Sequence, residues 1–291
     1  MRNAAIDSFY DADAIPLVVI LGTNEIASAV AVVLRYAHYS VVLSCSSFPP
    51  VIRRAMAFHD ALYGDQARVE EIEGVLADGA LQIAAIVAKP NCVAVTPLQL
   101  NDLIALRSPD VIIDARMQKQ MITPDYRRLA RLTIGLGPNF MVGENCDVAI
   151  ETHPAWTGRL LNSGVTAAAD GVARALGGAG AERFVYSGRG GLWHTAMDIG
   201  TRVYRHMTLG VLDGQPILAP IDGVLRGIVR DGTRAPPNVK LLEIDPRGRR
   251  ACWTGIDARG RALAEAALVA VTSAVARPAR QETCQSAERQ P

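Results

Sequence analysis

The stretch Leu17-Val-Val-Ile-Leu21, followed directly by Gly22-Thr-Asn24, decides the fold of this chain. Five consecutive apolar residues that end at a glycine are typical of a strand buried on both faces of a parallel sheet. Residues 25–36 then place apolar side chains at helical spacing, and Val41-Val-Leu43 forms another short apolar run. The order strand, helix, strand predicts a βαβ unit.

The same alternation of apolar runs and helical periods continues through the first half of the chain. We expect further strands at Ile83 to Val87, at Val111-Ile-Ile113 and at Leu132-Thr-Ile134, and a helix over 98–106. Strands that alternate with helices form a parallel sheet covered by crossover helices. The sequence therefore predicts an α/β fold whose first lobe, residues 15–161, is a Rossmann-like doubly wound sheet.

The second half of the chain contains an internal repeat with an offset of about 32 residues. The motifs Gly191-Leu-Trp193, Gly200-Thr-Arg202 and Leu209 are echoed by Gly223-Val-Leu225, Gly232-Thr-Arg234 and Leu241. A fixed offset indicates duplicated supersecondary units, and neither unit can bury its apolar side alone. We therefore predict that residues 183–258 form a lobe of two interlocking β-hairpin units.

Three further segments complete the predicted organisation. Residues 162–182 are rich in Ala and Gly and predict a linker or a loose helix between the lobes. Residues 259–276 have apolar side chains at helical spacing and predict a C-terminal helix. The tail over 277–291 is expected to be disordered.

The composition and charge exclude several classes of protein. Apolar residues make up 49% of the sequence and charged residues 20%, which is near the average of globular proteins. The 30 lysines and arginines nearly balance the 29 aspartates and glutamates. Because non-specific binding to nucleic acid needs an excess of positive charge, we expect no nucleic-acid partner.

Targeting signals and cysteines point to a cytoplasmic protein. The longest apolar runs, over 15–21 and 83–88, are shorter than the roughly 20 residues that cross a membrane, so no membrane partner is expected. The N-terminus lacks the basic and apolar order of a secretion signal, which predicts a cytoplasmic location. The five cysteines are scattered without a CxxC pair, so neither a disulfide framework nor a metal site is expected.

The first candidate ligand-binding residues are Gly22 and Asn24, in the turn after the first strand. In a doubly wound sheet this turn presents helix amides to a phosphate. Only Gly22 remains of the glycine fingerprint, and Asn24 stands where a glycine would let the backbone approach a pyrophosphate. We therefore expect no tight binding of NAD or NADP.

A second candidate is an anion site formed by Arg53 and Arg54. Both follow Pro49-Pro50 and begin a predicted helix whose apolar face is Ile52, Met56 and Leu62. Guanidinium groups prefer forked contacts with carboxylate or phosphate. The alternative is a solvated pair on a surface helix.

The remaining candidates follow two other predicted strands. Asp114 stands where open α/β sheets bind ligands, although it could equally cap a following helix. Gly135, Gly137, Pro138 and Asn139 form a stiff loop that either lets a ligand approach closely or makes a structural turn. The histidines make no Ser-His-Asp or Cys-His arrangement from spacing alone, so we assign no catalytic residue.

The order of motifs resembles the accessory proteins of selenium-dependent molybdenum hydroxylases, which are related to XdhC-type maturation factors. The resemblance covers roughly residues 17–271 and implies a role in handling or inserting a cofactor, with a client metalloenzyme or its maturation machinery as partner. The motifs that carry it are Gly22-Thr-Asn-Glu-Ile-Ala27, Pro49-Pro-Val-Ile-Arg-Arg54, Ala61-Leu-Tyr-Gly64, Asp110-Val-Ile-Ile-Asp-Ala115, Ile134-Gly-Leu-Gly-Pro-Asn-Phe140, Ile150-Glu-Thr152, Gly158-Arg159, Ala219-Pro-Ile-Asp-Gly-Val-Leu-Arg-Gly227 and Glu243-Ile-Asp-Pro-Arg-Gly248.

Three functions remain as hypotheses. The first is a maturation or assembly factor for a molybdenum or other metal-cofactor enzyme, binding a phosphorylated or pterin-type ligand in the first lobe. The second is a nucleotide-using enzyme, either a reductase or a transferase. The third is a non-catalytic scaffold or docking subunit. The cofactor is unknown, with a molybdopterin-type cofactor or a nucleotide as candidates, and self-association is left open.

The repeat and the resemblance together predict that the second lobe is an unmodified relative of the lipoyl and biotinyl carrier fold, a barrel-sandwich hybrid. In the carriers, the modified lysine lies at the hairpin tip between the half-units. Here that tip is Asp213-Gly214, a favoured pair for a two-residue turn, and Lys240 is far from it in the repeat. Protein produced beside active lipoyl and biotin ligases should keep its unmodified intact mass. A lipoyl or biotinyl group on Lys240 would contradict this.

Overall fold

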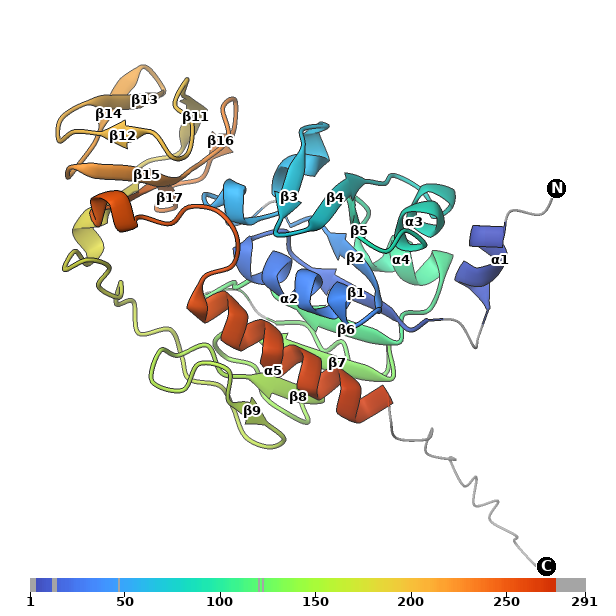
Figure 1. The fold of residues 1–291 in the computed structure, drawn as a ribbon. Helices are drawn as coiled ribbons and strands as arrows, with labels where there is room; N and C mark the ends of the chain where they lie inside the picture. Colours follow the sequence, from blue (N-terminus) through green and yellow to red (C-terminus); the bar gives the residue numbers. More distant parts are fainter. Residues whose placement is uncertain (1–3, 12–14, 47, 120, 122, 276–291) are drawn as a thin grey trace, which may run out of the picture.

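The computed structural model describes residues 4–11, 15–46, 48–119, 121 and 123–275, and it shows a mixed α/β protein (Figure 1). One lobe contains a nine-stranded, mostly parallel sheet, and the other contains two four-stranded antiparallel sheets. The expected tail over 277–291 lies outside the described residues. No helix in the described part of the chain combines the length and the apolar character needed to cross a membrane.

The large sheet is wound outward from β1 in both directions. The strands run in the order β3-β4-β5-β2-β1-β6-β7-β8-β9, and all neighbours are parallel except the two edge pairs. The chain leaves β1 toward β2 and later returns to the other side of β1 with β6. The strands are β1 (Leu17–Leu21), β2 (Ser40–Ser44), β3 (Ala67–Val69), β4 (Ile72–Leu76), β5 (Cys92–Thr96), β6 (Val111–Asp114), β7 (Leu132–Leu136), β8 (Val148–Ile150) and β9 (Leu160–Leu161).

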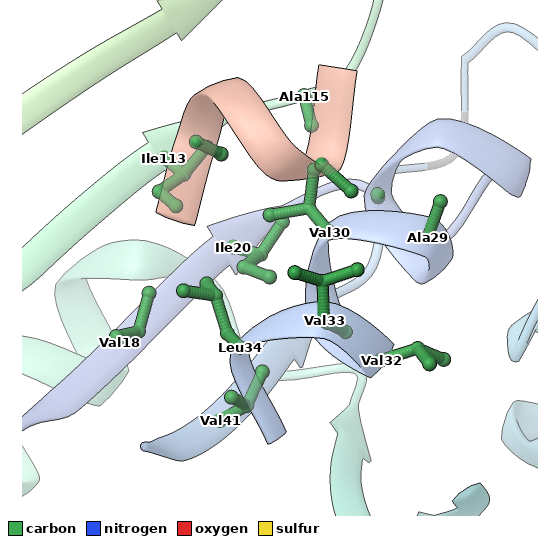
Figure 2. Close-up of a cluster of buried hydrophobic side chains, with 14 of the residues drawn as sticks. Val18, Ile20, Ala29, Val30, Val32, Val33, Leu34, Val41, Ile113 and Ala115 are labelled. Carbon is green, nitrogen blue, oxygen red and sulfur yellow. The ribbon is translucent and has the colours of Figure 1, made fainter. Parts of the chain in front are cut away.

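Helices cover both faces of this sheet, because alternate strand residues point to opposite sides. Val18 and Ile20 of β1 belong to the core beneath α2 and α5, and Val19 belongs to the core beneath α1, α3 and α4. Figure 2 shows Ile20 of β1, Val30 of α2 and Ile113 of β6 together in the first of these cores. The helices are α1 (Ala4–Tyr10), α2 (Glu25–Tyr36), α3 (Ala80–Val87), α4 (Leu100–Leu106) and α5 (Ala258–Val275).

The second lobe consists of two antiparallel sheets of four strands each. Its sheets run in the orders β10-β17-β15-β12 and β14-β13-β11-β16. The two orders have the same pattern. If β10, β11, β12 and β13 change places with β14, β15, β16 and β17, in that order, the first order becomes the second. Each sheet therefore takes two strands from residues 184–212 and two from residues 215–245. The strands are β10 (Phe184–Tyr186), β11 (Gly191–His194), β12 (Arg202–Val203), β13 (Thr208–Leu212), β14 (Gln215–Leu218), β15 (Gly223–Ile228), β16 (Arg234–Ala235) and β17 (Lys240–Asp245).

The turn between the repeats joins β13 to β14. Leu212 pairs with Gln215, and the two residues between them, Asp213 and Gly214, both have positive φ, at 45° and 78°. This is the backbone of a two-residue hairpin turn.

Two local expectations are wrong. Residues 83–87 form part of helix α3, and the strand of this region is β5, further along the chain. A short apolar run fits a buried helix as well as a strand. Here Ile83, Ala84 and Val87 are buried at helical spacing against the sheet.

The expected helix after Pro49-Pro50 is also wrong. The structure has two short 3-10 helices instead, η1 (Arg54–Met56) and η2 (His59–Tyr63). The reason is that its apolar residues face different cores, since Ile52 packs into the second lobe and Leu62 packs against the first. One face of a single helix could not bury both Ile52 and Leu62 in these two cores.

The chain between the lobes contains no helix over 162–180, all of which the structure describes. Its first part remains attached to the large sheet, because the amide of Val142 donates to the carbonyl of Gly164 and that of Thr166 donates to the carbonyl of Phe140. After the second lobe, the chain returns to the large sheet as α5, which packs beside α2 (Figure 1).

We predict that Gly135→Ala destabilises the protein by about 1–3 kcal/mol, the usual cost of overpacking a core. A Cβ atom at Gly135 would lie 2.0 Å from the ring of Phe140. Gly79→Ala is the matched control, because a Cβ there meets no atom within 4 Å and the backbone is extended. Urea unfolding should show a loss within about 1 kcal/mol for this control. Equal losses in both variants would contradict the packing role of Gly135.

Candidate functional site

Residues 115–119, which we call the edge loop, cross the carboxyl end of the large sheet. The amide of Ala115 donates to the carbonyl of Leu21. The carbonyl oxygen of Ala115 lies so close to Gly22 that a Cβ atom added at Gly22 would be 3.1 Å from it. Met117 approaches Gly137, and Gln118 donates to the carbonyl of Phe48 at 3.0 Å. The edge loop thus connects the ends of β1, β2, β6 and β7.

The turn after β1 is occupied by the chain's own groups. Asn24 caps α2 by accepting from the amides of Ile26 and Ala27 at 2.9 and 3.0 Å, and it donates to the carbonyl of Ala115 at 2.8 Å. The first helical residue, Glu25, adds a negative charge. Gly22, with a φ of 112°, is required by the close approach of the edge loop. Its presence is therefore explained by packing.

Asp114 faces a cation of its own chain. Arg116 donates to both carboxylate oxygens of Asp114, at 3.0 and 2.6 Å, and also to the hydroxyl of Tyr126. No helix follows β6 directly, so Asp114 does not cap one. Gly135, Gly137 and Pro138 are buried and Asn139 is exposed, with Phe140 filling the space over Gly135.

Arg53 and Arg54 join the two lobes. Arg53 donates to both oxygens of Glu243 on β17, at 2.7 and 3.2 Å, and to Glu25 at 3.1 Å. Arg54 donates to the carbonyl of Ile228 on β15 at 2.9 Å and to Asp60 at 2.6 Å. Both guanidinium groups therefore have carboxylate partners in this chain, in contrast to the solvated pair considered from the sequence.

The carboxylate of Glu243 is fully buried at the junction of the lobes. Besides Arg53, it accepts from Arg183 at 3.2 Å and from Arg226 at 3.4 Å. Burial alone would raise the pKa of Glu243, but the charge and hydrogen bonds of Arg53, with Arg226 and Arg183, hold this pKa below its ordinary value. Glu243 is therefore ionised at neutral pH.

More cations than carboxylates gather around Arg53 and Glu243. We call this set the junction cluster. Its carboxylates each lie next to Arg53, and its outermost cation, Arg259, is exposed and donates to the carbonyl of Thr152 at 3.3 Å. Its members are the cations Arg53, Arg183, Arg226, Lys240 and Arg259 and the carboxylates Glu25, Glu243 and Asp257.

Sequence reasoning missed most of the junction cluster. Arg183, Arg226, Lys240 and Glu243 lie far from Arg53 in the sequence, and no spacing rule connects them. One signal was present, because Glu243 occupies an interior position of a strand whose neighbours Leu242 and Ile244 are apolar. A charged residue in such a run indicates a buried charge with partners.

A second missed pair lies beside the turn after β1. The hydroxyl of Thr23 and Nδ1 of His59 are 2.8 Å apart, and both side chains are buried. Burial, together with the charges of Arg54 and Arg230, lowers the pKa of His59 to about 4 against the opposing effect of Asp60. The imidazole is therefore neutral at pH 7, and the pair ties η2 to the end of β1.

A pocket of about 210 Å³ lies toward the β9 edge of the large sheet. Its buried carboxylate, Glu151, accepts from the amides of Thr152, His153 and Ala167, each at 2.7 Å. These bonds hold the surrounding loops in place. The lining residues are Glu151, Trp156, Arg159, Leu161, Val165 and Ala167.

Within the described residues, no group of three or more His, Cys, Asp or Glu side chains is arranged to hold a metal ion. The chemistry that the structure does offer is cationic, and it is concentrated at the junction of the lobes. The junction cluster is therefore our candidate functional site.

Comparison with known proteins gives one distant relative. The chain is 29% identical over 259 residues to "Uncharacterized protein YqeB" of Escherichia coli (strain K12). The match covers 88% of this chain and 47% of YqeB, so the chain spans about half the length of that relative. No family model and no solved structure matches the chain.

We predict that Glu243→Gln lowers the free energy of unfolding by about 3–5 kcal/mol, because it leaves the buried Arg183 and Arg226 and the half-buried Arg53 without their shared carboxylate. The same change in the exposed Arg68–Glu71 pair, Glu71→Gln, should cost about 1 kcal/mol or less. Denaturant unfolding of the two variants checks this. A small loss in Glu243→Gln would show that Glu243 does not hold the junction together.

Acid should remove the contribution of Glu243 to the free energy of unfolding. Because its pKa is lower in the folded protein, the unfolded state binds the proton first, and stability falls as the pH drops. We expect the difference in unfolding free energy between the wild type and Glu243→Gln to be constant above about pH 5 and to shrink below the ordinary glutamate pKa of about 4.3. A difference independent of pH down to acid would contradict the assignment.

Proposed function

We propose that this chain is an accessory or maturation factor for a molybdenum or other metal-cofactor enzyme, and that it holds a phosphorylated or pterin-type ligand beside the junction cluster. The observation that carries the proposal is the local charge. Five cations face three carboxylates where the carboxyl end of the large sheet meets the second lobe. The sequence resemblance to molybdenum hydroxylase accessory proteins supplies the functional context.

The charge imbalance favours an anionic ligand over a neutral one. The inner part of the junction cluster is paired, because Arg53, Arg183 and Arg226 share Glu243. The outer cations, half-buried Lys240 and exposed Arg259, have fewer partners. An anion placed beside them relieves the repulsion among the cations and forms charge-assisted hydrogen bonds. The donor set therefore fits the phosphate of such a ligand.

The ligand position in this proposal differs from the one first expected. Gly22 and Gly135 approach other parts of the chain, and Asn24 uses its oxygen to cap α2. The start of α2 is therefore a poor place for a phosphate. Arg53 is retained, because it links the end of the large sheet to the second lobe.

The architecture supports a binding role with a partner. We classify the first lobe as Rossmann-like because its parallel sheet winds outward from β1 on both sides. We assign the second lobe to the barrel-sandwich hybrids, because each of its sheets combines strands of both repeats. The tip at Asp213-Gly214 offers no amine for a prosthetic group. This lobe then serves as a rigid surface for docking the client enzyme or its maturation machinery.

Native mass spectrometry of protein purified from its own source tests the proposal. We expect a non-covalent adduct with the mass of a phosphorylated small molecule, together with a co-purifying metalloenzyme or maturation protein. The variant Arg259→Gln should reduce the adduct about tenfold or more, because a lost charged hydrogen bond is worth about 1.5–3 kcal/mol.

The control for this experiment is Arg68→Gln, which removes an exposed cation of the edge strand β3 outside the junction cluster. It should leave the adduct unchanged. Protein that carries no anionic molecule and brings no metalloenzyme or maturation protein with it would overturn the proposed function. Turnover of a nicotinamide cofactor would favour the nucleotide-using enzyme instead.

A further inference from the structure

Lys240 has surroundings unlike those of the two other lysines of the chain. It is the first residue of β17 and pairs with Tyr186 of β10. Its Nζ lies 3.7 Å from the ring centre of Phe184, and the guanidinium of Arg183 lies 4.1 Å from the same centre. Lys240 is half-buried, whereas Lys89 and Lys119 are exposed.

The charges around Lys240 favour its neutral form. The groups that act on it are the cations Arg53, Arg183 and Lys119 and one carboxylate, Glu243. That carboxylate is already shared by three arginines. Burial lowers the pKa of Lys240 to about 8, with Arg53, Lys119 and Arg183 contributing in the same direction and Glu243 opposing them.

The lowered pKa changes the amount of reactive amine. Near neutral pH a larger fraction of the Lys240 side chains is therefore neutral than in an ordinary lysine, whose pKa is about 10.4. A neutral amine that is partly desolvated and surrounded by cations is the arrangement that activates a lysine as a nucleophile. The neighbouring cations also attract a negatively charged partner to the same place.

We propose that the Lys240 amine forms an imine with the aldehyde or ketone carbonyl of an anionic ligand held at the junction cluster. The nitrogen lone pair attacks the carbonyl carbon and gives a carbinolamine. The hydroxyl group of this carbinolamine takes up a proton and leaves as water. The amine gives up both of its hydrogens to that water, so a C=N bond replaces the C=O bond with no change in oxidation state. This inference rests on the proposed function, because it concerns the same site.

Reductive labelling of the whole chain tests the inference. The protein is treated near neutral pH with pyridoxal 5′-phosphate, an anionic aldehyde, and cyanoborohydride, which reduces an imine to a stable secondary amine. Peptide mass mapping then gives the labelling rate at Lys89, Lys119 and Lys240. We expect Lys240 to react about tenfold faster than the others or more, with a rate that rises with pH and reaches half of its maximum near pH 8.

Two variants and one second probe sharpen the experiment. Lys240→Arg keeps the positive charge and should abolish the fast labelling, and Lys119→Arg should leave the label on Lys240 in place. Pyridoxal without the phosphate should label Lys240 several-fold more slowly, and added inorganic phosphate should slow the reaction of pyridoxal 5′-phosphate.

The outcomes separate this inference from the proposed function. Equal labelling rates at the three lysines would overturn the nucleophilic role of Lys240, while a phosphorylated adduct in the native spectrum would leave the proposed function standing. Fast labelling of Lys240 by both aldehydes alike, unaffected by phosphate, would keep the nucleophile but overturn the anion site on which the ligand assignment depends.

Discussion

The carboxylate of Glu243 has no exposure to solvent and is compensated by three guanidinium groups. Such a buried charge costs several kcal/mol when a partner is removed. Arg53 belongs to the first lobe, whereas Arg183 and Arg226 come from the chain of the second. The lobes can separate only if these charges lose their partners. The amide of Ile228, which donates to the carbonyl of Ile52 at 2.8 Å, reinforces the same contact through the backbone.

The same constraint produces the chemistry of the site. Glu243 neutralises only part of the charge brought to the junction, and more cations than carboxylates act on Lys240. A structural ion pair and a reactive amine are therefore two parts of one arrangement. Glu25 and Asp257 limit the excess charge, since both lie next to Arg53.

The sequence predicted those parts of the molecule that local patterns determine. The first strand and α2 follow from apolar periodicity, and the two-residue turn follows from the pair Asp213-Gly214. The run over 83–87 was misassigned because a short apolar segment fits two structures. The candidate site was found only at Arg53, because its partner Glu243 is 190 positions away and meets it only through tertiary packing.

The position of α5 determines how the chain can fold as it leaves the ribosome. Leu263, Ala267 and Val271 are fully buried in the core of the large sheet, although they are made after the entire second lobe. The α2 face of the sheet therefore stays incompletely covered until about 100 further residues have been synthesised, which takes about 5–20 s at ordinary elongation rates. During that interval an apolar surface is open to solvent and to chaperones, so α5 acts as the closing step of folding for a lobe whose strand β1 is made long before it.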